Sequence, residues 1–456
     1  MLANLAIPVI VCVFAVLLFR WSYGKKYGSV FLTPPGPPGR LFIGNLFDIP
    51  TQNAWIRYRE MSRIYKSPLI FLKVFGANII IVDSLEVARD LFDKRSSIYN
   101  DRLDLTWSTL LSPYGHRLKE MRRLLHQEFG VETVKEYQTI QIVACREMLR
   151  QLALCPEGFM EHIRTSIGQI LLRSTYGISG EEGDHLIRSN EQCVRAFSAS
   201  SGKGANLVNA FPIPGTLPDC AAAHAFENIN ETAEHGYQVK VIRDTLGSVY
   251  GAGIDTGKTL TFYRFLGPLD RHAQTVSTLY TFILSMVLHP DFQKKAQQDI
   301  DRMIGQERLP NFSDRSSLPY VDAILNECLR LHPVFRLNIP HRLMQDDVYD
   351  GSFLPKGSII IANNWSILHD ESLYPQPFDF NPDRFIKDGR LDAEAIDPDI
   401  AAFGFGRRKC PGRYLAKDSL WLSIASILAC FNISNAVDDD GTLIIPEQIY
   451  EEGIMR

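Results

Sequence analysis

The sequence lacks an excess of basic residues: Lys and Arg number 48, Asp and Glu number 52, and the formal net charge is −4. A chain-wide basic footprint for nucleic acid is therefore excluded. The eight cysteines include no C-x-x-C pair, so neither a zinc site nor a thioredoxin-like site is indicated. No period of about 20–50 residues repeats, which excludes a solenoid or a propeller. Hydrophobic residues at 45% and charged residues at 22% are ordinary values, which exclude a disordered or low-complexity chain.

The first nineteen residues, from Met1 to Phe19, contain no charged side chain. A run of this length is close to the roughly 20 residues that cross the apolar part of a bilayer. Arg20, Trp21 and Tyr23 follow it, as is typical of the cytosolic flank of a membrane helix. A cleaved signal peptide needs a basic segment before its apolar run, and no basic residue precedes Arg20. The sequence therefore predicts a single transmembrane anchor over residues 1–23, with the rest of the chain in the cytosol.

Residues 24–40 connect this anchor to the body, and positions 33–39 read TPPGPPG. Because proline fixes φ and cannot continue a helix, the run predicts a stiff, extended hinge that orients the body. A proline-rich ligand for another protein module is the alternative interpretation.

Residues 41–456 are predicted to form one mainly helical domain with a small β-rich part near its start. Two β-rich runs around Gly76 predict a hairpin, and Ser84 is expected to cap a helix that runs to Lys94. The helix predicted over 415–429 is apolar on nearly every face, which predicts that it is buried. The predicted strands are 69–74, 79–82 and 358–362, and the other predicted helices are 280–288, 293–304, 320–331 and 415–429.

The most informative segment is FGFGRRKCPG at positions 403–412, just before the predicted buried helix. Its proline suits the first position of a helix, so Cys410 is expected near a helix N-terminus, where the dipole and free N–H groups stabilise a thiolate. Gly406 and Gly412 permit a close approach of the backbone to a large flat ligand, or a positive φ. Arg408 supplies a guanidinium for an anionic group. A thiolate beside glycines and an arginine is what an axial haem ligand needs.

This segment resembles the haem loop of the cytochrome P-450 superfamily, F-x-x-G-x-R-x-C-x-G. The fixed positions of that pattern are Phe403, Gly406, Arg408, Cys410 and Gly412. The resemblance implies the cytochrome P-450 fold and a haem b whose iron takes the Cys410 thiolate as its axial ligand, with the other four residues binding the cofactor. A glycine-rich turn that carries an inert cysteine is the alternative.

Two more motifs fit the same family. Glu327 and Arg330 match its E-x-x-R helix, and a spacing of three puts both on one helical face. Arg384, in the sequence FNPDRF, matches its P-x-R-F segment. The resemblance implies that these three residues form a buried structural ion network. It also makes Arg122 and Arg342 candidate partners for the haem propionates.

The distal side departs from the family pattern. A long helix there carries A/G-G-x-D/E-T-T in the family, whereas positions 270–275 read DRHAQT. Thr275 matches, Ala273 replaces the acid and Gln274 replaces the key alcohol. His272, Gln274 and Thr275 are the candidates for an altered proton path. The stretch before this helix and the C-terminus both look shorter than in the family, since the chain ends at Arg456.

The resemblance, closest to membrane-bound fungal members of secondary metabolism, implies a monooxygenase that inserts one oxygen atom of O2 into an apolar small molecule. A terpenoid or polyketide-like substrate is expected by analogy. Electrons would come from NADPH through a flavin reductase, and the chain would be a monomer anchored in the endoplasmic reticulum. The basic residues expected to dock the reductase by charge complementarity are Lys119, Arg123, Arg407, Lys409 and Arg413.

Three alternatives to this function stay open. The chain could bind haem with impaired or absent oxygenase turnover, or it could be a haem-thiolate enzyme that uses peroxide or rearranges an oxygenated substrate. A remote third is a nucleotide-binding P-loop at GIDTGKT, positions 253–259, although Ala252 stands where that loop needs its first glycine.

Overall fold

The computed structural model describes residues 32–102, 112–180, 274–437 and 440–444, together with positions 183, 237–239, 241–242, 245 and 446. The predicted anchor over 1–23, His272 and the P-loop-like segment lie outside the described residues. Within the described ranges, no helix is both long enough and apolar enough to cross a bilayer.

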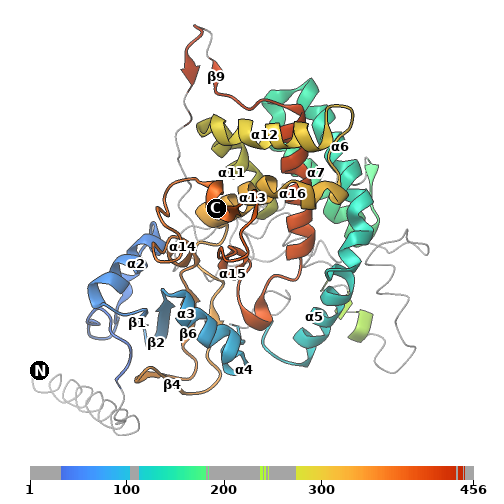
Figure 1. Cartoon of the computed structure of the whole chain (residues 1–456). Coiled ribbons are helices and arrows are strands. Elements are labelled where there is room, and N and C mark those ends of the chain that lie inside the picture. Colours follow the sequence, from blue (N-terminus) through green and yellow to red (C-terminus); the bar gives the residue numbers. More distant parts are fainter. Residues whose placement is uncertain are drawn as a thin grey trace, which may run out of the picture.

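A helical body makes up most of the described chain, as predicted (Figure 1). Its central helix is α16, Arg413–Cys430, which is buried along most of its length and carries the fully buried Trp421. Four helices pack against α16: α6 Gln138–Leu154, α11 Gln274–Leu288, α12 Pro290–Ile304 and α13 Pro319–Leu331. α7, Phe159–Tyr176, covers α6 and α11. The predicted separation of helices 280–288 and 293–304 is confirmed, but α12 begins three residues earlier than predicted, with Pro290 at its first helical position.

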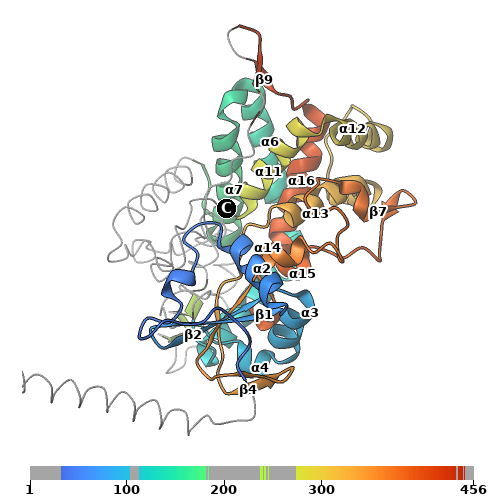
Figure 2. The same ribbon diagram turned by 90° about the vertical axis from the view of Figure 1, so that its left-hand side faces the viewer.

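A four-stranded sheet lies at the opposite end of the molecule from α12 (Figures 1 and 2). Its order is β1 Leu69–Val74, β2 Ala77–Val82, β6 Ile359–Ala362 and β3 His341–Arg342. The predicted β1–β2 hairpin is confirmed, and β2 then pairs in parallel with β6. The β-rich part is therefore not confined to the start of the body, because half of its strands come from the second half of the chain.

Both faces of this sheet are covered. Side chains alternate along β2, so Ile80 and Val82 join the main helical core while Ile79 and Ile81 face the other way. Helix α2, Ala54–Tyr65, closes that second face with Trp55 and Tyr58. The sheet is thus fixed between α2 and the helical body.

The segment after β2 differs from its prediction. One helix was expected from Ser84 to Lys94, but α3 is α-helical only over Leu85–Ala88, and Arg89–Lys94, η2, forms a π-helical turn. Ser84 occupies the N-cap position without a side-chain cap hydrogen bond. The wider turn matters below, because η2 packs against the loop that holds Cys410.

Shorter elements complete the fold. The helical ones are η1 Leu46–Asp48, α4 Ser96–Tyr99, α5 His116–Phe129, η3 Thr133–Tyr137, η4 Pro156–Gly158, η7 Phe312–Ser317, α14 Asn364–Leu368, η8 Pro382–Phe385, α15 Asp399–Ala402 and η9 Gly406–Arg408. The strands are β4 Asp347–Tyr349, β5 Ser352–Leu354, β7 Ile386–Lys387, β8 Arg390–Leu391, β9 Ala436–Val437 and β10 Leu443–Ile444.

The described part of the proline-rich connector is extended and lies along the body. Phe353 donates its backbone N–H to the Leu32 carbonyl, and Phe71 of β1 donates to the Pro35 carbonyl, both at 2.9 Å. A Cβ atom built on Gly36 would stand 2.0 Å from the Phe71 carbonyl oxygen, so only glycine permits this approach. Residues 32–36 are therefore attached to two hairpins, the β1–β2 hairpin and the antiparallel β4–β5 pair.

Candidate functional site

Cys410 lies in a compact loop between α15 and α16. Its backbone N–H donates to the Phe403 carbonyl at 2.8 Å, and the Lys409 N–H donates to the Gly406 carbonyl at 3.1 Å. Helix α16 begins at Arg413 with Gly412 at its N-cap, so the expectation that Pro411 would be its first residue was wrong. The loop is closed by its own hydrogen bonds and presents Cys410 just ahead of the helix.

Burial raises the pKa of the Cys410 thiol. A hydrogen bond from the Gly412 backbone and the charges of Arg122 and Arg413 act in the opposite direction, and burial has the larger effect. By surface exposure the residue as a whole is partly buried. A thiolate here consequently calls for a further positive charge, and a metal ion bound to the sulfur provides one. This fits an axial iron ligand.

Cationic side chains gather beside this loop. Arg408 donates from Nε to the Asn100 carbonyl at 2.9 Å and from Nη2 to the Ser112 carbonyl at 2.7 Å. Burial, and then the charges of Arg102 and Arg122, lower the pKa of Arg408 to about 8. Its Nη1 is buried without a hydrogen-bond partner among the described residues. A buried guanidinium with an unused donor, next to two other arginines, is suited to a bound carboxylate.

Two further residues beside Arg408, one arginine and one histidine, were not predicted from the sequence. Arg102 is buried and donates to the carbonyls of Ile339 and Pro340. His341 is fully buried, with one ring nitrogen 2.6 Å from the Tyr99 carbonyl. Burial, followed by the charge of Arg102, lowers the pKa of His341 well below its ordinary value.

The two predicted propionate partners, Arg122 and Arg342, differ from each other in their surroundings. Arg122, on α5, donates from Nη2 to the Lys409 carbonyl at 2.6 Å, beside Cys410. Burial lowers its pKa, which the Cys410 thiolate charge would counteract. Arg342 is exposed, and the structure does not bring it into the cluster. Neighbours on a strand point to opposite faces, so it is His341 that faces inward.

The glycines and aromatic residues of the loop have distinct surroundings. Gly406 has φ +51°, and an added Cβ would lie 2.1 Å from the Phe92 carbonyl oxygen, so this position requires glycine. Gly412 has no atom within 4 Å of an added Cβ, which leaves open space beside Cys410. Phe403 is buried, and it closes the loop through its carbonyl.

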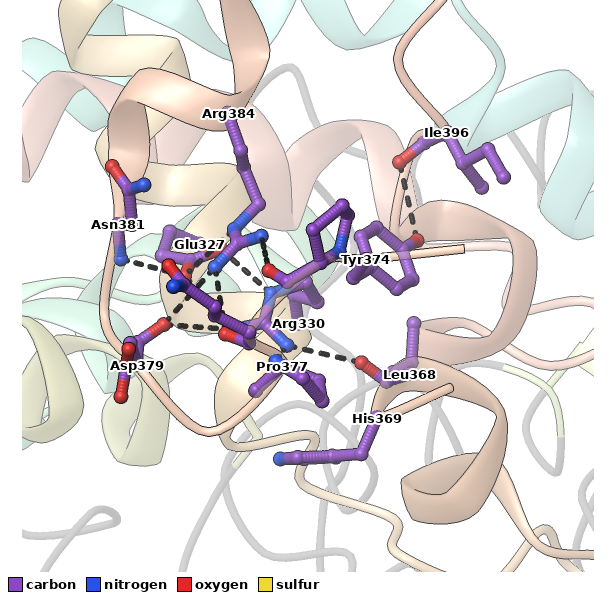
Figure 3. A network of polar contacts seen from close by, with 12 residues as sticks. Glu327, Arg330, Leu368, His369, Tyr374, Pro377, Asp379, Asn381, Arg384 and Ile396 are labelled. Atoms are coloured by element: carbon purple, nitrogen blue, oxygen red, sulfur yellow. Dashed lines mark hydrogen bonds and ion pairs between the residues drawn. The ribbon is translucent and has the colours of Figure 1, made fainter. Parts of the chain in front are cut away.

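The E-x-x-R residues form a buried ion network with Arg384 (Figure 3). Arg330 donates to both carboxylate oxygens of Glu327 at 2.7 and 2.8 Å, and Arg384 Nε lies 3.2 Å from the same carboxylate. Arg330 also donates to the carbonyls of Leu368 and Pro377. The network ties α13 to the irregular segment that leads toward the Cys410 loop.

The distal candidates are described only in part. Helix α11 begins at Gln274, whose side chain lies outside the described residues, and His272 precedes the described segment. Thr275 is buried, in line with a place inside the protein. The buried hydroxyl side chains on α11 are Thr275, Ser277, Thr278, Thr281 and Ser285.

Known proteins share this sequence and architecture. The family model for cytochrome P-450 matches residues 272–449. A cytochrome P-450 monooxygenase of Armillaria gallica is 36% identical, covering 96% of this chain and 92% of the relative. Tryptamine 4-monooxygenase of Psilocybe cyanescens is 32% identical, with coverages of 93% and 90%. A zebrafish cytochrome P-450 solved with progesterone shares the fold, with a TM-score of 0.67, 23% identity and coverages of 84% and 93%. The chain, with its cysteine loop and buried E-x-x-R pair, belongs to the cytochrome P-450 family.

Proposed function

We propose that the protein is a haem-thiolate monooxygenase that inserts one oxygen atom of O2 into an apolar small molecule, with electrons from NADPH delivered by a reductase. The observation that carries the proposal is the convergence of Cys410 with the cationic cluster. One desolvated sulfur and several buried cationic donors meet the two needs of haem, an iron ligand and partners for its carboxylates.

The residues that would hold the cofactor have separate roles. Cys410 would ligate the iron, while Arg408, Arg102 and Arg122 would hold the propionates. When bound, the haem would supply dioxygen activation, and a thiolate ligand favours O–O cleavage. The chain's own contribution would be to hold the sulfur in a hydrogen-bonded loop and to neutralise the propionate carboxylates.

A reductase surface is supported by the charges around Tyr114. Lys119 Nζ lies 5.5 Å and the Arg407 guanidinium 5.7 Å from the centre of the Tyr114 ring. Lys119, Arg123 and Arg407 are exposed. They come from α5 and from the Cys410 loop, which supports docking of an acidic partner on the side of the molecule that carries this loop.

Substrate and membrane attachment rest on sequence and on relatives. One relative is named for tryptamine, so the expected terpenoid or polyketide-like substrate is only one class within this range of similarity. The charge-free segment 1–19 supports a single-pass anchor that keeps the body at the endoplasmic reticulum.

A haem-binding protein with impaired turnover is the second candidate. Ala273 and Gln274 stand where the family has its distal acid and alcohol. The alignment with the Armillaria gallica relative runs over 492 positions, more than the 456 residues of this chain, which supports shorter segments here.

The test is expression of the full chain with a fungal reductase in yeast microsomes. We expect a thiolate signature in the ferrous carbon-monoxide spectrum, lost in Cys410→Ser, and NADPH-dependent oxidation of a small molecule in metabolite profiles. The signature without NADPH turnover would select the second candidate. Turnover with peroxide alone would select a peroxide-using enzyme. No thiolate signature would overturn the proposal.

A further inference from the structure

The π-helical turn η2 contacts the Cys410 loop through the Asp93 carboxylate, the Phe92 carbonyl and the Phe92 ring. Asp93 Oδ1 accepts the backbone N–H of Gly406 at 2.6 Å. The Phe92 carbonyl lies so close to Gly406 that no side chain fits between them. The ring of Phe92 stacks on that of Phe405, with centroids 5.6 Å apart and planes at 28°. Phe92 and Asp93 of η2 therefore contact Phe405 and Gly406 of the loop.

The contacts of η2 with Gly406 are linked to Cys410 by the hydrogen bonds of the loop itself. Gly406, whose N–H is held by Asp93, uses its carbonyl to accept the N–H of Lys409. Lys409 precedes Cys410, whose own N–H is bound to the Phe403 carbonyl. A movement of Gly406 would thus shift the backbone that carries the sulfur.

The turn that carries Asp93 is fixed on both sides by polar contacts with β4. Before Asp93, the Asp90 carboxylate accepts the Tyr349 hydroxyl at 2.9 Å. After it, Arg95 binds the Asp347 carboxylate at 2.7 Å. Groups held in this way by outer contacts keep a geometry more closely than isolated ones. A π-helical turn inside a helix also often marks a functional position.

We propose that Asp93 is a positioning residue for Cys410. Its carboxylate holds the Gly406 N–H, and this bond keeps the loop in the conformation that presents the sulfur. The proposal rests on the proposed function in so far as the sulfur ligates iron, but the hold on the loop is a property of the chain alone.

The variants Asp93→Ala and Asp93→Asn separate the hydrogen bond from the charge. Both remove the negative charge, but the asparagine amide oxygen still accepts the Gly406 N–H. Asp301→Ala is the matched control, because Asp301 is an exposed aspartate on α12. Should Asp93→Ala not fold, as judged by thermal unfolding, Asp93→Ser replaces it, since its oxygen is one bond closer to the backbone and does not reach Gly406.

Two measurements on the full chain test the proposal. The first is the rate at which the ferrous carbon-monoxide complex loses its thiolate signature on warming. The second is hydrogen–deuterium exchange of the peptide covering 401–412 without haem. We expect Asp93→Ala to accelerate both by roughly fivefold, the factor for one net hydrogen bond, and we expect Asp93→Asn and Asp301→Ala to stay within about twofold of the wild type.

The outcomes separate the two ideas. If the wild type binds no haem, the proposed function fails, and the exchange measurement still decides the role of Asp93. If exchange and spectral stability are the same in Asp93→Ala, Asp301→Ala and the wild type, the positioning role is overturned. Equal acceleration in Asp93→Ala and Asp93→Asn would overturn it too, because the lost charge would then be the cause.

Discussion

Glu327 and Arg330 meet within a single turn of α13 through two hydrogen bonds of 2.7 and 2.8 Å, and neither side chain is exposed to solvent. Arg384 reaches the same carboxylate from η8, and the Asn381 N–H adds a further bond at 2.8 Å. The buried carboxylate is thus surrounded by donors from two distant segments. Its role is architectural, because it joins α13 to the chain that leads toward Cys410.

Removal of one partner should leave an uncompensated buried charge. We expect Glu327→Ala to lower the free energy of unfolding by about 3–5 kcal/mol. Urea unfolding followed by circular dichroism measures this. The matched control is Glu60→Ala, which breaks the exposed i,i+3 pair with Arg57 and should cost less than about 1 kcal/mol. Similar losses in both variants would contradict a special role for the buried network.

The cationic cluster predicts which arginine retains haem. Arg102→Gln removes a buried charge beside Arg408, and we expect haem transfer to apomyoglobin to become roughly ten- to a hundredfold faster, as for loss of a charge-assisted hydrogen bond. Arg342→Gln changes an exposed side chain on β3 and should leave the rate of haem transfer within about twofold of the wild-type rate. The reverse order would show that the outward-facing arginine binds the cofactor.

Asp83 gives the stability a pH dependence. Burial raises the pKa of Asp83 to about 6, although Ser366, Asn363 and Arg59 act against this. Because the folded pKa lies above the unfolded value of about 3.9, the folded state favours the protonated form. The stabilising contribution is complete below about pH 4 and is lost as the pH rises through about 6.

The variant Asp83→Asn isolates this effect. Its amide keeps an acceptor for Asn363 and can donate to the Ser366 hydroxyl, and both of these side chains hydrogen-bond the Asp83 carboxylate in the wild type. We expect the free energy of unfolding of the wild type, relative to the variant, to fall by about 1–2 kcal/mol between pH 4 and 7. Urea titrations at several pH values measure it, and a constant difference between the two proteins would refute the assignment.

The positive surface near Tyr114 predicts a salt-dependent electron transfer. We expect Lys119→Glu combined with Arg123→Glu to slow NADPH-dependent haem reduction by roughly tenfold or more at low salt, with a smaller ratio at high salt. Lys294→Glu is the control, because Lys294 is an exposed residue of α12, and it should leave the rate of haem reduction nearly unchanged. An equal effect of the control, or a salt-independent one, would exclude docking by charge at this surface.

Sequence reasoning succeeded where the information is local. The Cys410 loop, the E-x-x-R pair and the β1–β2 hairpin each lie within a short stretch. The hairpin follows from its β-rich runs around Gly76, whereas the loop and the E-x-x-R pair were identified by their resemblance to family motifs. Arg102 and His341 were missed because they meet only through the pairing of β3 with β6 and of Asp101 with Arg342. Arg342, the predicted propionate partner, adjoins His341 on β3, and the two side chains face opposite ways because adjacent strand residues alternate.

The π-helical turn was missed for another reason. Its residues, RDLFDK, have an ordinary helical composition, and nothing in their order indicates a wider turn. The contacts that accompany it, from Asp90 to Tyr349 and from Asp93 to Gly406, join residues more than 250 positions apart. Tertiary contacts of this range cannot be read from a single sequence.

The attachment of residues 32–36 to the β1–β2 and β4–β5 hairpins limits where the chain can bend between the body and the proposed anchor. Leu32 and Pro35 are hydrogen-bonded to Phe353 and Phe71, so this part of the connector moves with the sheet. A pivot between the body and the proposed anchor must then precede Leu32. The length of chain between the end of the proposed anchor at residue 23 and Leu32, and not the proline run, would set how far the body reaches over the membrane and how freely it tilts.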